Sequence, residues 1–356
     1  MAIKTEITNF LDKTSDGSSQ LDRNIDVILY YYGFTGEVGP TLESTGQHFG
    51  VTRERVRQIL NRYFRDRASL GLLPAITKCA HVVKSRDVWL MSELKTAFEK
   101  EIGDDLGTHP LNVLTLIKEL NGRTDYDTFD GQIHRISRPA EECFVMHKKY
   151  VKGFYRVMKA VRTVPGIVGI VNTAELDTGD IPLDLVRKAI TIHEDSWTMT
   201  VGDTLVYLYE DRDNFLVNAS EKVFSICDEV PLNRLATALA NSLRRRSSKF
   251  TYPNEQIVEA YIRASRYFSI KDNCAKGEMV SFMGKKAELS PIETNVTEKL
   301  KTKRTMSYIE LRDHLVEAGY NKPVIDKAVM ASAMVFVDKT LGPKMYAYSL
   351  VGTAVA

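Results

Sequence analysis

The sequence has few of the features that mark a secreted, membrane-bound or metal-stabilised protein. Its 356 residues include only four cysteines, Cys79, Cys143, Cys227 and Cys274, and none stands in a CxxC pair. Widely spaced cysteines without histidines at ligand spacing favour reduced thiols over a zinc site or a disulfide framework. No apolar run has the length of a membrane span, and residues 1–20 lack the apolar core of a signal peptide. We therefore expect a cytoplasmic protein without metal, cofactor or membrane partner.

Sequence motifs of catalysis are also missing. The chain has no glycine-rich phosphate loop, no HExxH pair and no nucleophile elbow. The adjacent acids Asp104-Asp105 and Glu194-Asp195 could bind a metal in a nuclease, but neighbouring acids on loops are usually solvated. The sequence therefore predicts a protein that is not an enzyme.

The chain also lacks a large excess of positive or negative charge. The 48 Lys and Arg residues almost balance the 46 Asp and Glu residues, for a formal net charge of +2. Any binding of nucleic acid must therefore come from local basic patches. The apolar fraction of 44% is ordinary for a globular protein, and the length suffices for several small domains.

Residues 41–59 are the most informative stretch, because they predict two short helices joined by a tight turn. Thr41 can cap the first helix, and Thr52 can cap the second. Gly46 allows the second helix to approach closely, and Gly50 can take the positive φ that closes the turn. Val56 and Ile59, three residues apart, are expected to face inward. The polar side chains left pointing outward are Arg53, Glu54, Arg57 and Gln58.

This stretch closely resembles the promoter-recognition helix-turn-helix of primary bacterial sigma factors. The run Val51-Thr-Arg-Glu-Arg-Val-Arg-Gln-Ile59 follows the family pattern, and the resemblance covers about residues 22–68. Thr45 departs from it, since the family usually has Ile or Val there, and so do residues 60–63. Nothing resembles the sigma segment that melts DNA and grips the polymerase. We therefore do not expect a working sigma factor.

The resemblance implies which side chains touch DNA. The residues expected to contact bases in the major groove are Arg53, Glu54, Arg57 and Gln58. The residues expected to hold phosphates and set the register are Thr41, Thr52, Arg55, Arg62 and Arg65. The alternative is a solvated arginine face on an ordinary helix. The long motif match favours DNA contact.

Beyond Leu70, the same order of elements is predicted four times: helix, strand, helix, helix, hairpin. This order is typical of a winged helix-turn-helix. The expected fold is mainly α with short β-hairpins, an N-terminal sigma-like helix-turn-helix being followed by tandem winged-helix modules. The expected segments are a flexible lead at 1–20, the helix-turn-helix at 21–72, and winged modules at 73–140, 150–212, 218–276 and 288–352.

Three details of the modules are expected from local patterns. The first module should contain a hairpin at Tyr126–Ile136 with Asp130-Gly131 at its turn. The second should contain a strand at residues 166–170, and residues 277–286 are interpreted as a joint containing Gly and Lys.

The modules differ in the charge of their expected recognition helices. Those of the first, second and fourth modules carry little positive charge, which suits a structural or protein-contacting role. The third has a basic cluster, Arg244, Arg245, Arg246 and Lys249, between two predicted helices. This cluster either contacts phosphate or is a solvated cap, since cations are also favoured at a helix C-terminus.

The leading hypothesis is a sequence-specific double-stranded DNA-binding protein, a nucleoid-associated transcriptional regulator that reads the major groove with helix 52–62. The modules would add a self-association surface or contacts to other proteins. One alternative is a DNA-recognition or architectural subunit of a mobile-element, replication or phage-defence complex. Another is a factor that binds RNA polymerase through the sigma-like segment.

Overall fold

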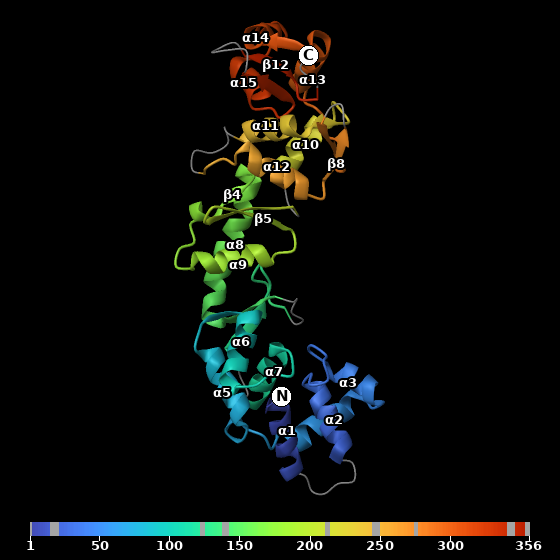
Figure 1. Cartoon of the computed structure of the whole chain (residues 1–356), viewed down its shortest axis with the longest axis vertical. Helices are drawn as coiled ribbons and strands as arrows, with labels where there is room; N and C mark the ends of the chain where they lie inside the picture. Colours follow the sequence, from blue (N-terminus) through green and yellow to red (C-terminus); the bar gives the residue numbers. More distant parts are fainter. Residues whose placement is uncertain are drawn as a thin grey trace. The chain divides into compact units, whose positions relative to one another are not determined.

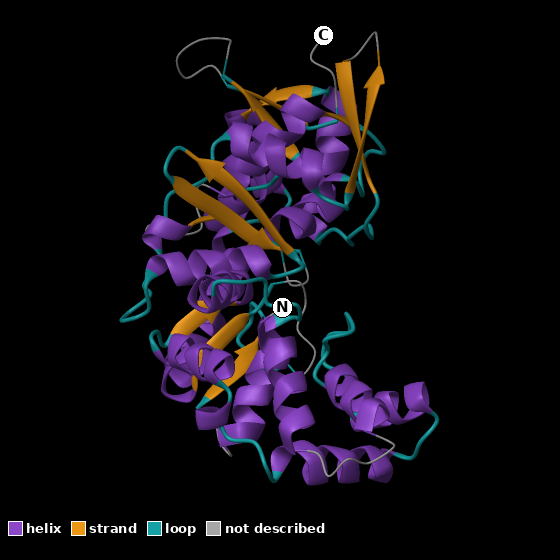
Figure 2. Ribbon diagram, turned by 60° about the horizontal axis from the view of Figure 1, so that its bottom comes forward, coloured by secondary structure: helices purple, strands orange, loops and turns teal. Residues whose placement is uncertain are grey.

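The computed structural model describes residues 2–14, 21–121, 125–136, 142–210, 214–243, 250–273, 277–339 and 346–352. The chain divides into two compact units, Met1–Arg156 and Val157–Ala356, which are coloured along the sequence in Figure 1. Both are mainly helical with small antiparallel sheets, shown as orange strands in Figure 2.

The chain opens with a well-packed helix, α1 (Ala2–Thr14). Its apolar side chains Ile3, Ile7 and Leu11 are at most 2% exposed, and they belong to the core of the first unit. The prediction of a flexible lead is therefore wrong for residues 2–14. A stripe repeating every four residues lies along one face of a helix, and burial of that face fixes α1 on its neighbours.

The helix-turn-helix segment follows α1. Its elements are α2 (Leu21–Tyr31), α3 (Leu42–Phe49), α4 (Arg53–Leu60), a π-helical turn η1 (Asn61–Arg65) and a 3₁₀ turn η2 (Leu70–Leu72). The inner face of α4 is apolar: Val56, Ile59 and Leu60 are at most 5% exposed and share one core with α1 and α2. The predicted pair of helices is confirmed.

The first unit continues with helices around a three-stranded sheet. The elements are α5 (Pro74–Lys84), β1 (Val88–Leu90), α6 (Met91–Ile102), α7 (Pro110–Asn121), β2 (Tyr126–Phe129) and β3 (Phe144–His147). The hairpin expected at Tyr126–Ile136 is formed only in part. Phe129 bridges Arg135, but the long ladder of β2 runs to β3, from Tyr126↔His147 to Phe129↔Phe144. The sequence pattern missed β3.

Helix α8 (Lys148–Val168) crosses the boundary between the units. It is followed by β4 (Val171–Asn172), the 3₁₀ turn η3 (Thr173–Glu175), α9 (Leu183–Ile192), β5 (Ser196–Val201) and β6 (Thr204–Tyr209). The strand predicted at residues 166–170 is wrong, since α8 extends to Val168 and the strand starts at Val171. Gly169, with φ +83°, ends the helix in the left-handed region.

A third set of elements surrounds the next sheet. These are α10 (Phe215–Val223), β7 (Val230–Pro231), α11 (Leu232–Leu243), α12 (Glu255–Ala264), β8 (Phe268–Asn273) and β9 (Gly277–Phe282). The interpretation of residues 277–286 as a joint is corrected. β9 is the central strand, because Val280 pairs with both Val230 and Ile270 and is fully buried.

The last set is α13 (Pro291–Lys303), β10 (Thr305–Ser307), α14 (Tyr308–Glu317), α15 (Lys322–Met330), β11 (Val335–Asp338) and β12 (Ala347–Leu350). All four sheets of the described residues share one antiparallel strand order. In each, the last strand lies between the other two: β1-β3-β2, β4-β6-β5, β7-β9-β8 and β10-β12-β11. The predicted recurrence is therefore present in the strand order.

Within the second unit, an arginine joins the last two sets of elements. Arg234 of α11 is 8% exposed and donates hydrogen bonds to the carbonyl oxygens of Leu350 and Val351, at 3.2 and 3.1 Å. Its guanidinium also lies 4.1 Å from the ring centroid of Phe336. These contacts hold α11 against the end of β12.

Candidate nucleic-acid interface

Both helices of the turn begin with the caps that the sequence predicts. The Thr41 hydroxyl accepts a hydrogen bond from the Ser44 amide at 3.0 Å, and the Ser44 hydroxyl accepts from the Thr41 amide at 2.9 Å. Thr52 accepts from the Arg55 amide at 3.2 Å. These bonds satisfy amides that the first turn of a helix leaves unpaired, and so they fix where α3 and α4 start.

The turn between the helices depends on two glycines. Gly50 has φ +64°, and its amide bonds to the end of α3. A Cβ placed on Gly46 would lie 2.7 Å from the Val51 carbonyl oxygen and 3.3 Å from the Arg53 amide nitrogen. The close approach of α4 to α3 therefore leaves no room for a side chain at position 46, as the sequence predicted.

The outer face of α4 gathers the four side chains predicted to contact bases, Arg53, Glu54, Arg57 and Gln58, and all of them are exposed. Glu54 is the centre of this group. It accepts hydrogen bonds from Nε and Nη2 of Arg57 at 2.9 and 2.7 Å, and from the Gln58 amide at 3.5 Å. The Arg57 hydrogen bonds lower the pKa of Glu54, and Glu54 raises that of Arg57. Glu54 and Arg57 therefore both stay charged, and Glu54 holds the guanidinium of Arg57 in place.

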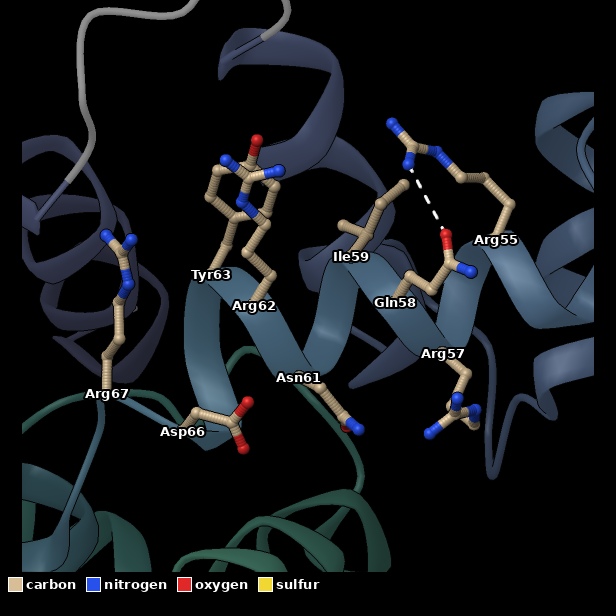
Figure 3. A pocket seen from close by; sticks show the side chains of 9 residues that line it. All are labelled: Arg55, Arg57, Gln58, Ile59, Asn61, Arg62, Tyr63, Asp66 and Arg67. Carbon is tan, nitrogen blue, oxygen red and sulfur yellow. Dashed lines mark hydrogen bonds between the residues drawn. The ribbon is translucent and has the colours of Figure 1, made fainter.

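A polar hollow of about 510 Å³ lies beside this face, along α4 and η1 (Figure 3). Arg55 points toward Gln58 across one end, with a donor–acceptor distance of 3.5 Å. Arg62 lies over Tyr63, its guanidinium 5.5 Å from the ring centroid. Arg55, Arg57, Arg62 and Arg67 line the hollow with Asp66 as the one acid, so the net charge of its lining is positive. Arg55 and Arg62, which the sequence predicts to contact phosphates, thus line the same hollow.

Arg65 does not lie with the other predicted phosphate contacts. Its Nε and Nη2 donate to the Glu119 carboxylate of α7, at 2.8 and 2.6 Å, and only 22% of its side chain is exposed. Tyr32 also donates to Glu119, at 2.6 Å. Burial acts to lower the pKa of Arg65, but the hydrogen bond to Glu119 and the nearby charges of Glu119, Tyr32 and Tyr31 together raise it. Glu119 therefore already neutralises the charge of Arg65, and the phosphate role of this residue stays a prediction.

A buried asparagine that sequence reasoning missed fixes the loop before α3. Asn112 of α7 is 2% exposed; its amide nitrogen donates to the Glu37 carbonyl at 3.0 Å, and its oxygen accepts from the Gly39 amide at 3.0 Å. Gly33 packs so closely on Asn112 that a Cβ there would lie 1.9 Å from its amide nitrogen. The helix-turn-helix is thus held on α7. One signal for this role is present in the sequence, since Asn112 is a polar residue between the apolar positions of α7.

The other predicted features give no site among the described residues. The basic cluster Arg244, Arg245, Arg246 and Lys249 lies outside them, as does Cys274. Burial raises the pKa of Cys79 and of Cys143 to about 12, which makes these thiols poor nucleophiles. No described group of three or more His, Cys, Asp or Glu side chains is placed to hold a metal ion. Nor is any described helix both long and apolar enough to cross a membrane.

The capped helices, the glycine turn and the exposed polar face of α4 together form a helix-turn-helix of the DNA-binding type. Residues 22–65 match the family model described as Sigma-70, region 4, which confirms the resemblance predicted for this segment. The match covers this segment alone within the 356-residue chain. A comparison with curated proteins gave no match.

Proposed function

We propose that the chain is a sequence-specific double-stranded DNA-binding protein that regulates transcription, and that α4 reads the major groove. The observation that carries the proposal is the exposed face of α4 in a segment that matches sigma region 4. Its apolar back is buried, and α7 holds the loop before α3. A rigidly mounted helix with forked donors on its free face suits direct reading of base edges.

The side chains of this face divide into two roles. Arg57 donates its fork to a guanine, and Glu54, which holds that fork in the free protein, accepts from the amine of a neighbouring cytosine. Arg55 and Arg62, on the hollow beside α4, bind phosphates and set the register. Thr41 and Thr52 place two exposed helix N-termini nearby, where the helix dipole favours an anion.

We further propose that each of the four sheets belongs to a winged-helix module. The support is the common order of helices and strands, with the last strand central in every sheet. Small modules of this size bury little surface alone, so neighbours in contact stabilise one another. The contacts of Arg234 between α11 and β12 are of this kind.

Binding selections on random DNA test the reading role of α4. Arg57→Ala should cost roughly 1–3 kcal/mol at its own base pair and relax the sequence preference there. Arg62→Ala should weaken all sequences alike and reduce the slope of log affinity against log salt by about 0.9. Lys100→Ala, an exposed cation on α6, is the matched control and should change neither. Absence of binding at low salt would refute the proposal.

A second candidate is a subunit of a larger DNA-processing complex. The observation that favours it is an apolar hollow of about 820 Å³ around β10, α14 and β12, where Ile309 is 59% exposed and Tyr346 is 42% exposed. Exposed apolar patches commonly mark protein contacts. Genome-wide mapping of bound sites separates the two: a few peaks upstream of genes indicate a regulator, whereas broad or foreign-DNA binding indicates a complex.

A third candidate, a polymerase-associated factor, follows from the match to sigma region 4. Co-migration of the purified chain with core RNA polymerase is expected in that case. Loss of the co-migrating complex in an α4 variant, with retention in Lys100→Ala, would link the contact to this segment.

A further inference from the structure

Helix α8 carries a concentration of positive charge that the helix-turn-helix does not explain. Its sequence, KKYVKGFYRVMKAVRTVPGIV, contains Lys and Arg at six positions and no Asp or Glu. No acidic residue occurs anywhere between Glu142 and Glu175. In a chain whose acids and bases almost balance, this helix is an exception.

The cations of α8 form a stripe on the side facing solvent. Lys152, Arg156 and Lys159 follow at spacings of four and three, so they share one face, and all three are exposed. The opposite face is apolar and buried, with Phe154 and Met158 at most 1% exposed. Burial of one side of α8 in the core therefore fixes the basic side outward.

This stripe has no described counter-charge and does not help the helix to form. Lys149, off the stripe, pairs with Asp87 at 2.8 Å, whereas none of the described carboxylates pairs with Lys152, Arg156 or Lys159. Like charges four residues apart, such as those of Lys152 and Arg156, destabilise a helix. The arrangement thus costs helix stability, which is the expected pattern for side chains that serve a ligand.

We propose that the basic stripe of α8, defined by Lys152, Arg156 and Lys159, is a second DNA-binding surface that holds backbone phosphates without reading sequence. A row of Lys and Arg is typical of nucleic-acid interfaces, which are polar and strongly positive, while protein interfaces are depleted in Lys. A membrane surface does not fit, because the apolar face that would enter the bilayer is inside the core. This surface is distinct from α4 and binds whichever sequence α4 selects.

The test compares two double variants of the full chain on a duplex of roughly 40 base pairs, a length chosen to extend beyond the one or two helical turns that a single helix-turn-helix contacts. Lys152→Gln/Arg156→Gln removes two charges from the stripe, and Lys84→Gln/Lys100→Gln removes two exposed charges from α5 and α6. The stripe variant should lower the slope of log affinity against log salt by about 1.8, which corresponds to on the order of 60-fold weaker binding at 0.1 M salt. The control variant should keep the wild-type slope. Equal slopes for the two variants would overturn the proposal and point to an acidic protein as the partner of α8.

A second arm separates this proposal from the reading role of α4. In an Arg57→Ala background on a duplex of arbitrary sequence, the stripe variant should still lower the slope of log affinity against log salt by about 1.8. If wild type shows no sequence preference but the stripe variant loses its slope, the function proposed for α4 fails and that proposed for α8 stands. If the wild type shows a sequence preference but the stripe variant keeps the wild-type salt slope, the function proposed for α4 stands and that proposed for α8 fails.

Discussion

Replacing Arg65 by alanine separates the two roles that can be given to this residue, phosphate contact and attachment of the helix-turn-helix to α7. Breaking a buried ion pair by removing one partner costs about 3–5 kcal/mol. The Arg65 and Glu119 side chains are 22% and 20% exposed, so solvent screens part of the loss. Tyr31 and Tyr32 also continue to donate to Glu119. We therefore expect a cost of about 2 kcal/mol, below the fully buried range.

Amide hydrogen exchange on the full chain measures this cost locally. A loss of about 2 kcal/mol corresponds to roughly 30-fold lower protection of amides in η1, α2 and α7. Amides of α14, in the second unit, should be unchanged. Arg62→Ala is the matched control, since its exposed guanidinium lies only three residues away and contacts Tyr63.

A double-mutant cycle and a salt titration show whether this reasoning is correct. Arg65→Ala and Glu119→Ala together should cost less than the sum of the single changes, because each removes the same pair. Additive effects, or a loss for Arg65→Ala no larger than for Arg62→Ala, would refute the structural role. A fall of about 0.9 in the DNA salt slope of Arg65→Ala would restore the phosphate role predicted from the sequence.

Three further changes test other contacts. Gly46→Ala places a Cβ 2.7 Å from the Val51 carbonyl and should cost about 2 kcal/mol in thermal unfolding, while Gly71→Ala, which meets nothing within 4 Å, should be nearly neutral. Arg234→Ala removes the hydrogen bonds to the Leu350 and Val351 carbonyls and should lower protection of β12 amides by about 3 kcal/mol. Burial raises the pKa of Glu6 above its ordinary 4.5, so the folded state binds this proton more tightly. The stability that Glu6 contributes is therefore present below pH 4.5 and lost as pH rises through the folded pKa. Glu6→Gln should gain in melting temperature relative to wild type between pH 4 and pH 7.

A strand is easiest to recognise in a sequence where a clear turn residue follows it. The hairpin of β5 and β6 has Gly202, at φ +57°, at its tip, and its register follows from the pattern. β3 was missed because Phe144, Val145 and Met146 are all fully buried. A short continuous apolar run at the centre of a sheet has no period of two, so periodicity cannot distinguish it from a helix segment.

The face of α4 could be predicted because its capping, turn and exposed positions are all local in sequence. The different surroundings of Arg62 and Arg65 could not be predicted in this way. Both are arginines in the same π-helical turn, and what separates them is Glu119, 54 residues away from Arg65. Likewise, the role of Asn112 depends on Gly39, 73 residues distant. Long-range pairing of this kind leaves no mark on spacing or composition.

The place of α7 explains why this helix has so little basic charge. In a winged helix, α7 would be the helix that enters the groove. Here its polar side chains Asn112 and Glu119 hold the helix-turn-helix, and among residues 111–120 only Lys118 is exposed. A helix covered in this way cannot also lie in a groove, so positive charge on it would serve no ligand. In this structure α7 thus supports the helix-turn-helix that carries α4.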